Sequence, residues 1–98
     1  MILNGKAKKD FKEFLYNKYD VLYKLKDYHK TMLYAEIIEW FDSVGIIITS
    51  DYFELNKGYY SEILDSNFAI VKPTRQEALI EAIKKANEIY NEKYSISQ

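Results

Sequence analysis

The side chains best suited to binding a partner are acids and tyrosines that gather in the middle of the chain. Tyrosine offers rigid contact area at a low entropic cost, and clustered acids attract a basic partner. We therefore expect a protein-binding surface here, although charged residues on strands also serve to prevent edge-to-edge aggregation. The candidate residues are Asp51, Tyr52, Glu54, Tyr59, Tyr60 and Glu62.

Residues that could support catalysis are few. The chain has no cysteine, which excludes disulfides, thiolate zinc sites and cysteine nucleophiles. His29 is the only histidine, and Ser43 lies in Asp-Ser-Val-Gly, which is not the G-x-S-x-G motif of a nucleophilic serine. Glu36 and Glu39 have the spacing of an ordinary helix surface. The sequence predicts a protein that is not an enzyme and has no metal site and no cofactor.

The net charge of −1 conceals an uneven distribution along the chain. Residues 1–30 carry a net charge of +4, residues 31–72 carry −5, and residues 73–98 are neutral. The basic segment offers an alternative function, because clustered lysines bind the phosphates of nucleic acids. The candidate nucleic-acid contacts are Lys6, Lys8, Lys9 and Lys12.

Three helices are expected to position these residues. Apolar side chains at helical spacing predict the first helix from Asn4, as N-cap, to about Tyr19, and the second from about Leu33 to Val44. Gly45 fits the position that follows a helix. Thr74-Arg75-Gln76-Glu77 matches a capping box and opens the third helix, which should run to about Glu92. A loop is expected over residues 20–30 and a tail over residues 95–98.

Between the second and third helices, the apolar pattern changes to that of strands. Residues 45–55, 59–64 and 68–71 are rich in β-branched and aromatic residues. Asn56-Lys57-Gly58 predicts a hairpin turn in which the glycine supplies a positive φ. Both faces of the first strand are mixed, so alternation does not decide which face is buried. We expect one domain, residues 1–98, with an ααβββα order and a two-layer α+β sandwich.

This order of strands and final helix resembles that of double-stranded RNA-binding domains. The resemblance implies a lysine cluster at the start of the last helix, where it would grip phosphates. Here Thr74-Arg75-Gln76-Glu77-Ala78 offers one base and one acid. The architecture is thus expected without that family's binding site.

As a whole, the sequence resembles small proteins encoded by phages and prophages of AT-rich bacteria, particularly Bacteroidetes. The segments that prompt this are Leu3-Asn4-Gly5-Lys6-Ala7-Lys8-Lys9-Asp10-Phe11, Trp40-Phe41-Asp42-Ser43-Val44-Gly45-Ile46, and Thr74-Arg75-Gln76-Glu77-Ala78 to Ile89-Tyr90-Asn91. The resemblance implies a context in which small proteins bind and block a host factor, such as a CRISPR effector. Codon bias of such a genome is an alternative source of the ten tyrosines.

The leading hypothesis is therefore a non-enzymatic, anti-CRISPR-like inhibitor. It would bind a host effector that handles nucleic acid and occlude its binding groove. The alternative is a nucleic-acid-binding accessory or regulatory module that uses the lysine-rich first helix. Homo-oligomerisation through a sheet edge, or through Phe11, Phe14 and Leu15, is a third possibility. The sequence has no apolar stretch of membrane-spanning length and turns charged at its start, so we expect a cytoplasmic location in a bacterial host cell, without a membrane partner.

Overall fold

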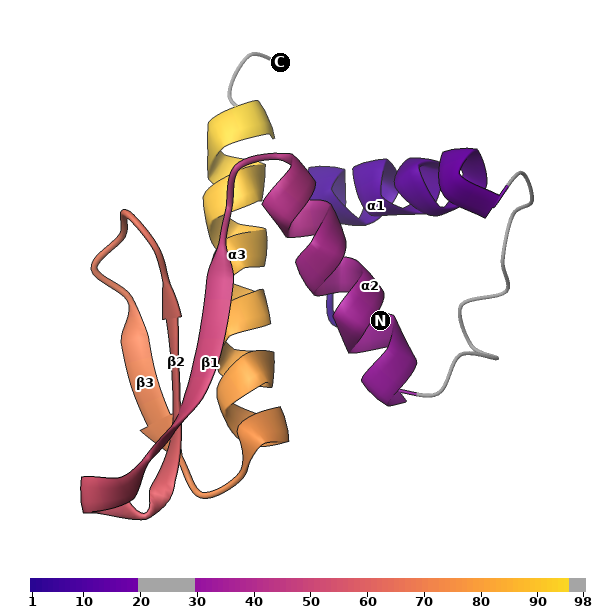
Figure 1. The fold of residues 1–98 in the computed structure, drawn as a ribbon. Coiled ribbons are helices and arrows are strands. Elements are labelled where there is room, and N and C mark those ends of the chain that lie inside the picture. Colours follow the sequence, from indigo (N-terminus) through magenta and orange to yellow (C-terminus); the bar gives the residue numbers. More distant parts are fainter. Residues whose placement is uncertain (20–29, 96–98) are drawn as a thin grey trace.

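A computed structural model describes residues 1–19 and 30–95 of the chain. Figure 1 shows the helices α1 to α3, the strands β1 to β3 and the short 3-10 turn η2. Their bounds are α1 Gly5–Tyr19, α2 Lys30–Ser43, β1 Ile48–Phe53, η2 Glu54–Asn56, β2 Gly58–Ile63, β3 Ala69–Lys72 and α3 Arg75–Ser95. The predicted ααβββα order and α+β class are confirmed. Residues 20–29, which include His29 and most of the expected loop, lie outside the described residues, as do residues 96–98 of the expected tail.

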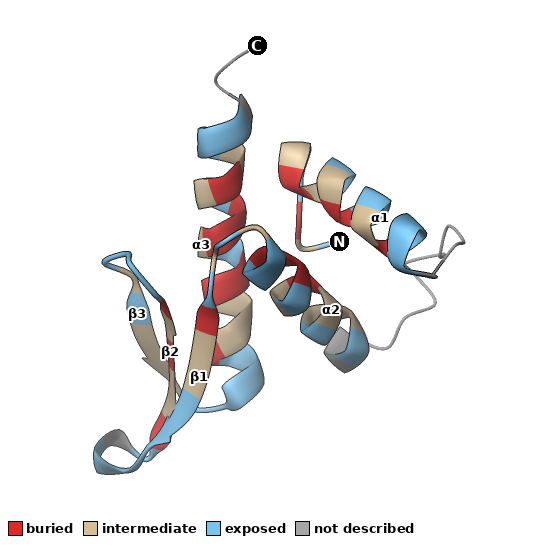
Figure 2. Cartoon of the chain, turned by 45° about the horizontal axis from the view of Figure 1, so that its top comes forward, coloured by how far each residue is buried: buried red, intermediate tan, exposed pale blue. Residues whose placement is uncertain are grey.

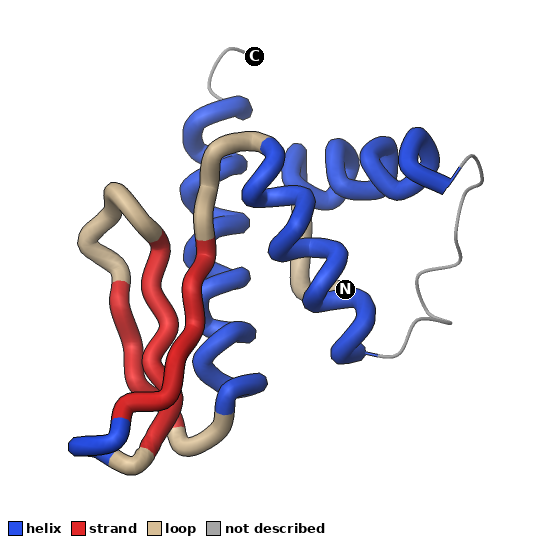
Figure 3. The backbone as a smooth tube through the Cα atoms, in the orientation of Figure 1, coloured by secondary structure: helices blue, strands red, loops and turns tan. Residues whose placement is uncertain are grey.

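The three strands form an antiparallel sheet in the order β1-β2-β3. Helix α3 lies along one face of the sheet and contacts all three strands (Figures 1 and 3). The side of α3 that meets the core bears Ala78, Ala82 and Ala86, all fully buried. Small side chains let a helix approach a sheet closely. Because α3 covers one face of the sheet, the opposite face points away from the helices.

Helices α1 and α2 pack against α3 rather than over the middle of the sheet, and α2 also contacts β1. Aromatic rings fill the junction. The ring of Trp40 lies 4.8 Å from that of Tyr90 and 5.9 Å from that of Phe11, measured between centroids. Figure 2 shows buried residues on the facing sides of the helices. Phe11 and Leu15 belong to this core, so two of the three residues proposed for self-association through α1 are already covered.

Asparagines of α3 hold the start of α1. The Ala7 N–H donates to Asn91 Oδ1 over 2.7 Å, which gives α1 the cap that its own N-terminus needs. The Asn91 side-chain amide donates to the carbonyl oxygen and to Oδ1 of Asn4, and the Asn87 amide also donates to Asn4 Oδ1. Asn4 occupies the predicted N-cap position, because its carbonyl oxygen accepts from the Lys8 N–H over 3.2 Å. Its side chain, however, accepts from α3 and does not cap α1.

Two other predicted helix ends are confirmed, whereas α2 begins at Lys30, before the predicted Leu33. Gly45 follows α2 with a φ of +88°, and the Glu77 N–H donates to Thr74 Oγ1 at the start of α3 over 3.1 Å. Helix α3 continues to Ser95, three residues beyond the predicted Glu92.

The turn before β2 differs from the prediction. Lys57, not Gly58, adopts the positive φ, of +48°. Gly58 is instead the first residue of β2, where a Cβ would lie 2.8 Å from the Lys72 carbonyl oxygen. The glycine is thus required for the close approach of β3 and not for a left-handed conformation.

No helix among the described residues is both long enough and apolar enough to cross a membrane.

Candidate protein-binding surface

The strand register divides the sheet residues between two faces. Asp51, Tyr60 and Val71 stand opposite one another on adjacent strands, and so share one face. Because side chains alternate along a strand, this face turns away from Ile48 and Ile63, which are buried in the core. We call it the outer face. Its residues are Ile47, Thr49, Asp51, Phe53, Tyr60, Glu62, Leu64, Ala69 and Val71.

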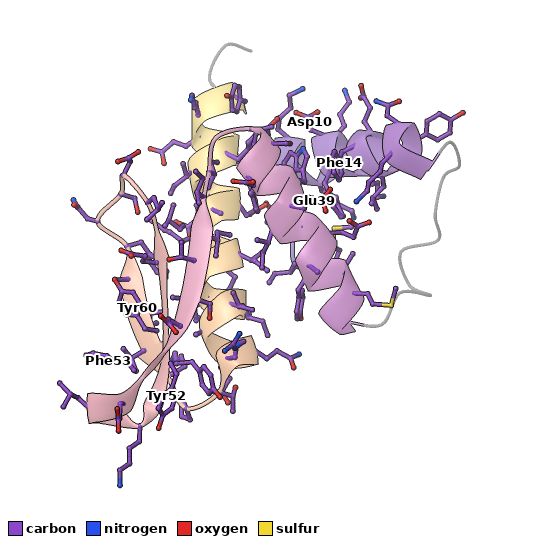
Figure 4. The ribbon with its side chains drawn as sticks, viewed as in Figure 1. Asp10, Phe14, Glu39, Tyr52, Phe53 and Tyr60 are labelled. Atoms are coloured by element: carbon purple, nitrogen blue, oxygen red, sulfur yellow. The ribbon has the colours of Figure 1, made fainter. Side chains whose placement is uncertain are left out.

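The six predicted binding residues do not all share this face. Asp51, Tyr60 and Glu62 lie on it, whereas Tyr52 and Tyr59 stand opposite each other on the face that carries α3. Glu54 lies in η2, at the tip of the hairpin. Figure 4 shows Phe53 and Tyr60 on the side of the sheet away from the helices.

The outer face combines exposed apolar side chains with acids. Phe53 is 39% exposed, and its ring lies 6.3 Å from the ring of Tyr60. Ile47 and Leu64, at the other end of the face, are 40% and 43% exposed. Asp51 lies between these apolar ends. Antiparallel sheets commonly leave one face to water, but that face is then mostly polar, so the exposed Ile, Leu and Phe make this face a candidate contact surface.

The charge of the outer face is entirely negative among the described residues. Asp51 and Glu62 are its only ionisable acids, and no lysine or arginine belongs to it. The nearby Glu62 carboxylate, which can accept a hydrogen bond from the neutral Tyr60 hydroxyl, is the main cause that raises the pKa of Tyr60 above its ordinary value. The tip adds Glu54 and the 87% exposed Leu55, together with exposed Lys57, which lines a hollow beside Val71.

Tyr52 and Tyr59 belong to a different environment. Their rings meet edge to face with centroids 5.4 Å apart. The Arg75 guanidinium lies 5.1 Å from the centroid of Tyr59, and Lys72 is the β3 neighbour of Tyr59 in the register. These two tyrosines therefore lie beside basic groups and apart from the acids of the outer face.

The lysines of the alternative hypothesis lie on α1. Lys9 and Lys12 are exposed, Lys8 is partly buried, and Lys6 forms an ion pair with Asp10 over 3.2 Å. Lys12 is a helical neighbour of both Lys8 and Lys9, and Lys8, three residues before Phe11, flanks the buried side of α1. They form a small basic patch remote from the sheet.

Of the residues considered for catalysis, His29 lies outside the described residues and Ser43 makes a local hydrogen bond. The Ser43 hydroxyl donates to the Trp40 carbonyl oxygen over 2.6 Å, as at many helix ends. The described part of the chain contains no group of three or more acid, histidine or cysteine side chains that could hold a metal ion. A polar hollow of about 410 Å³ between α1 and the ends of α2 and α3 includes Asp10, but Tyr90 already donates to that carboxylate over 2.5 Å.

The candidate residues from the sequence do not include the apolar part of the outer face, namely Ile47, Phe53, Leu64 and Val71. Ile47 and Phe53 are each an even number of residues from Asp51, so alternation along the strand places all three on the same face. The face could not be chosen because its opposite side carries Ser50 and Ser61, which resemble solvent-facing residues.

Comparison of the chain with protein-family models, with curated proteins and with solved structures finds no match.

Proposed function

We propose that this chain is a non-enzymatic protein that binds another protein through the outer face of its sheet. The observation that supports this most is an uncovered sheet face where exposed Ile47, Phe53 and Leu64 surround acids with no base among them. Apolar and aromatic groups supply contact energy at an interface, while the acids favour a partner of opposite charge. The expected partner is a basic protein surface with apolar side chains at its centre.

The mode of action that follows is occlusion. A basic surface that normally receives nucleic acid would accept the acids of the outer face in place of phosphates, and Phe53 with Tyr60 would supply rigid contact area. The phage resemblance adds a biological setting to this proposal. In that setting the partner is a nucleic-acid-handling effector of the host, and binding inhibits it, as an anti-CRISPR protein inhibits its target.

The experiment compares two double variants with equal changes in net charge. Asp51→Lys with Glu62→Lys reverses the outer face, and Glu13→Lys with Glu92→Lys reverses exposed acids on α1 and α3. Each tagged protein is used to capture partners from a lysate of a Bacteroidetes host, and a protein retained by the wild type is then purified. Its association rate with each variant is measured at 50 and 300 mM salt, together with its ability to bind nucleic acid.

The proposal predicts that the purified partner is basic, and that the outer-face variant associates with it at least tenfold more slowly than the control variant. Raising the salt should slow the wild type and should change the outer-face variant little. The wild type should also displace nucleic acid from the partner. Equal association of the two variants would refute the outer face as the binding surface. Salt-sensitive binding of the isolated chain to nucleic acid, lost on replacing Lys8, Lys9 and Lys12 by Gln, would favour the alternative module instead.

A further inference from the structure

The only arginine of the chain, Arg75, is exposed at the first residue of α3. Arg75, Leu79, Ala82 and Ala86 follow one another at intervals of four, three and four residues, which places them on one side of the helix. The last two are fully buried against the core, so the apolar stripe of α3 begins at a guanidinium. Every other base of the chain is lysine, 13 in all. Arginine differs from lysine by its planar fork, which binds carboxylates through two parallel hydrogen bonds.

Arg75 lies at the rim of an apolar groove. The groove has a volume of about 320 Å³, opens to solvent, and lies between α2 and the first turns of α3. Tyr34, Ala35 and Ile38 line it from α2, and Leu79 lines it from α3, with Gln76 beside Arg75. No acid lines it. The groove thus offers an apolar wall and one positive end.

The charge at this end is available to a ligand. Within the described residues, Arg75 forms no ion pair, and its guanidinium packs over the ring of Tyr59. The N–H groups of Arg75 and Gln76 have no partner within α3, because the first residues of a helix lack preceding carbonyls. Thr74 uses its hydroxyl to accept from Glu77 and its carbonyl to accept from Ala78. A positively charged fork therefore adjoins the positive end of a helix dipole.

We propose that this groove binds the carboxyl-terminal residue of another polypeptide. The apolar side chain of that residue lies against Ile38 and Leu79, and its terminal carboxylate is held by Arg75. The unpaired amides of the first turn add hydrogen bonds, as in other sites that capture a chain terminus. An open groove suits a peptide because the preceding residues can leave it, and Gln76 can bond their backbone. This site is separate from the outer face, so the two proposals can fail independently.

The test uses a labelled hexapeptide that ends in Leu with a free carboxylate, and the same peptide with an amidated end. Binding to the full chain is followed by fluorescence anisotropy. Arg75→Gln removes the fork, Arg75→Lys keeps the charge without the fork, and Ala35→Phe fills the groove while leaving Arg75 in place. Lys93→Gln, at the far end of α3, is the matched loss of one positive charge. Circular dichroism and thermal unfolding verify that each variant is folded.

We expect the free-acid peptide to bind at least tenfold more tightly than its amide. Arg75→Gln should abolish this difference, Arg75→Lys should reduce it, Ala35→Phe should weaken both peptides, and Lys93→Gln should change neither. The outer-face variant Asp51→Lys with Glu62→Lys should bind the peptide as the wild type does. Equal binding of acid and amide, or no binding of either, would overturn the proposal. Octanoate that competes as tightly as the peptide would assign the groove to fatty acids, and an amidated peptide with an internal glutamate that binds equally would remove the need for a chain terminus.

Discussion

Asn91→Ala is predicted to detach the start of α1 from α3. The side chain of Asn91 makes three hydrogen bonds across the two helices, of 2.7 Å from the Ala7 N–H, 3.0 Å to the Asn4 carbonyl oxygen and 2.9 Å to Asn4 Oδ1. Loss of the first bond removes the cap of α1, and loss of the other two leaves polar atoms of Asn4 with fewer partners.

The expected loss of unfolding free energy is about 2 kcal/mol. Removing a helix cap costs about 1 kcal/mol, and the two bonds to Asn4 contribute roughly 0.5–1 kcal/mol each because they are partly exposed. Alanine recovers roughly 0.5 kcal/mol, since it is a better helix former than asparagine. For a domain of this size, about 2 kcal/mol lowers the melting temperature by roughly 8–16 °C.

Thermal unfolding followed by circular dichroism measures this change. Asn17→Ala is the matched control, since Asn17 is exposed on α1 and its replacement reports helix propensity alone. It should leave the melting temperature unchanged or slightly raised. Asn91→Asp keeps the oxygen that accepts from Ala7 and should be less destabilising than Asn91→Ala. A melting temperature of Asn91→Ala within 2 °C of the control would refute the role of Asn91 as a cap supplied by another helix.

Three further changes test other parts of the fold. Gly58→Ala places a Cβ 2.8 Å from the Lys72 carbonyl oxygen and 3.1 Å from Val71, so urea unfolding should report a loss of about 1–3 kcal/mol, unlike exposed Asn67→Ala. Thr74→Ala removes the cap of α3 and should cost about 1 kcal/mol in the same assay; a change below 0.3 kcal/mol would contradict it. Burial and the hydrogen bond to Asp10 raise the pKa of Tyr90 above its ordinary value of 10.0. The stability that Tyr90 contributes is therefore fully present below pH 10 and is lost as the pH rises further. Tyr90→Phe should lose less stability than the wild type between pH 9 and pH 11, and exposed Tyr16→Phe should behave as the wild type.

Local signals sufficed for the fold class and for two of the three helix starts and ends that were singled out. Thr74 and Gly45 act on backbone groups within a few residues of themselves, so their patterns can be read directly from the sequence. The cap of α1 is different. Asn91 lies 84 residues from Ala7, and no local pattern relates the two. The position of Asn4 is that of an N-cap residue, but its side chain accepts hydrogen bonds from Asn87 and Asn91 of α3 instead.

The buried face of the sheet was left open by the sequence for a related reason. Burial usually selects apolar residues, yet Ser61 is fully buried and Phe53 is exposed. Helix α3 approaches the sheet closely through alanines, so a small side chain such as that of Ser61 fits beneath it. The buried Ser61 hydroxyl has a hydrogen-bond partner, because it donates to the Thr49 carbonyl oxygen over 2.8 Å. Only the packed structure supplies this information. The structure places Tyr59 and Tyr60 on opposite faces of the sheet, although the two are adjacent, identical residues in the sequence.

The central claim, that a protein partner binds the outer face, is tested most directly by methyl NMR of the complex with the purified partner. Ile47 and Ile48 are neighbours whose side chains lie on opposite faces, with Ile47 exposed and Ile48 buried, so the pair forms an internal control. Partner addition is predicted to shift or broaden the methyl signals of Ile47, Leu64 and Val71 and to leave Ile48 and Ile38 largely unchanged. Changes confined to Ile38 and Leu79, or to Leu15 on α1, with Ile47 and Val71 unaffected, would contradict the account.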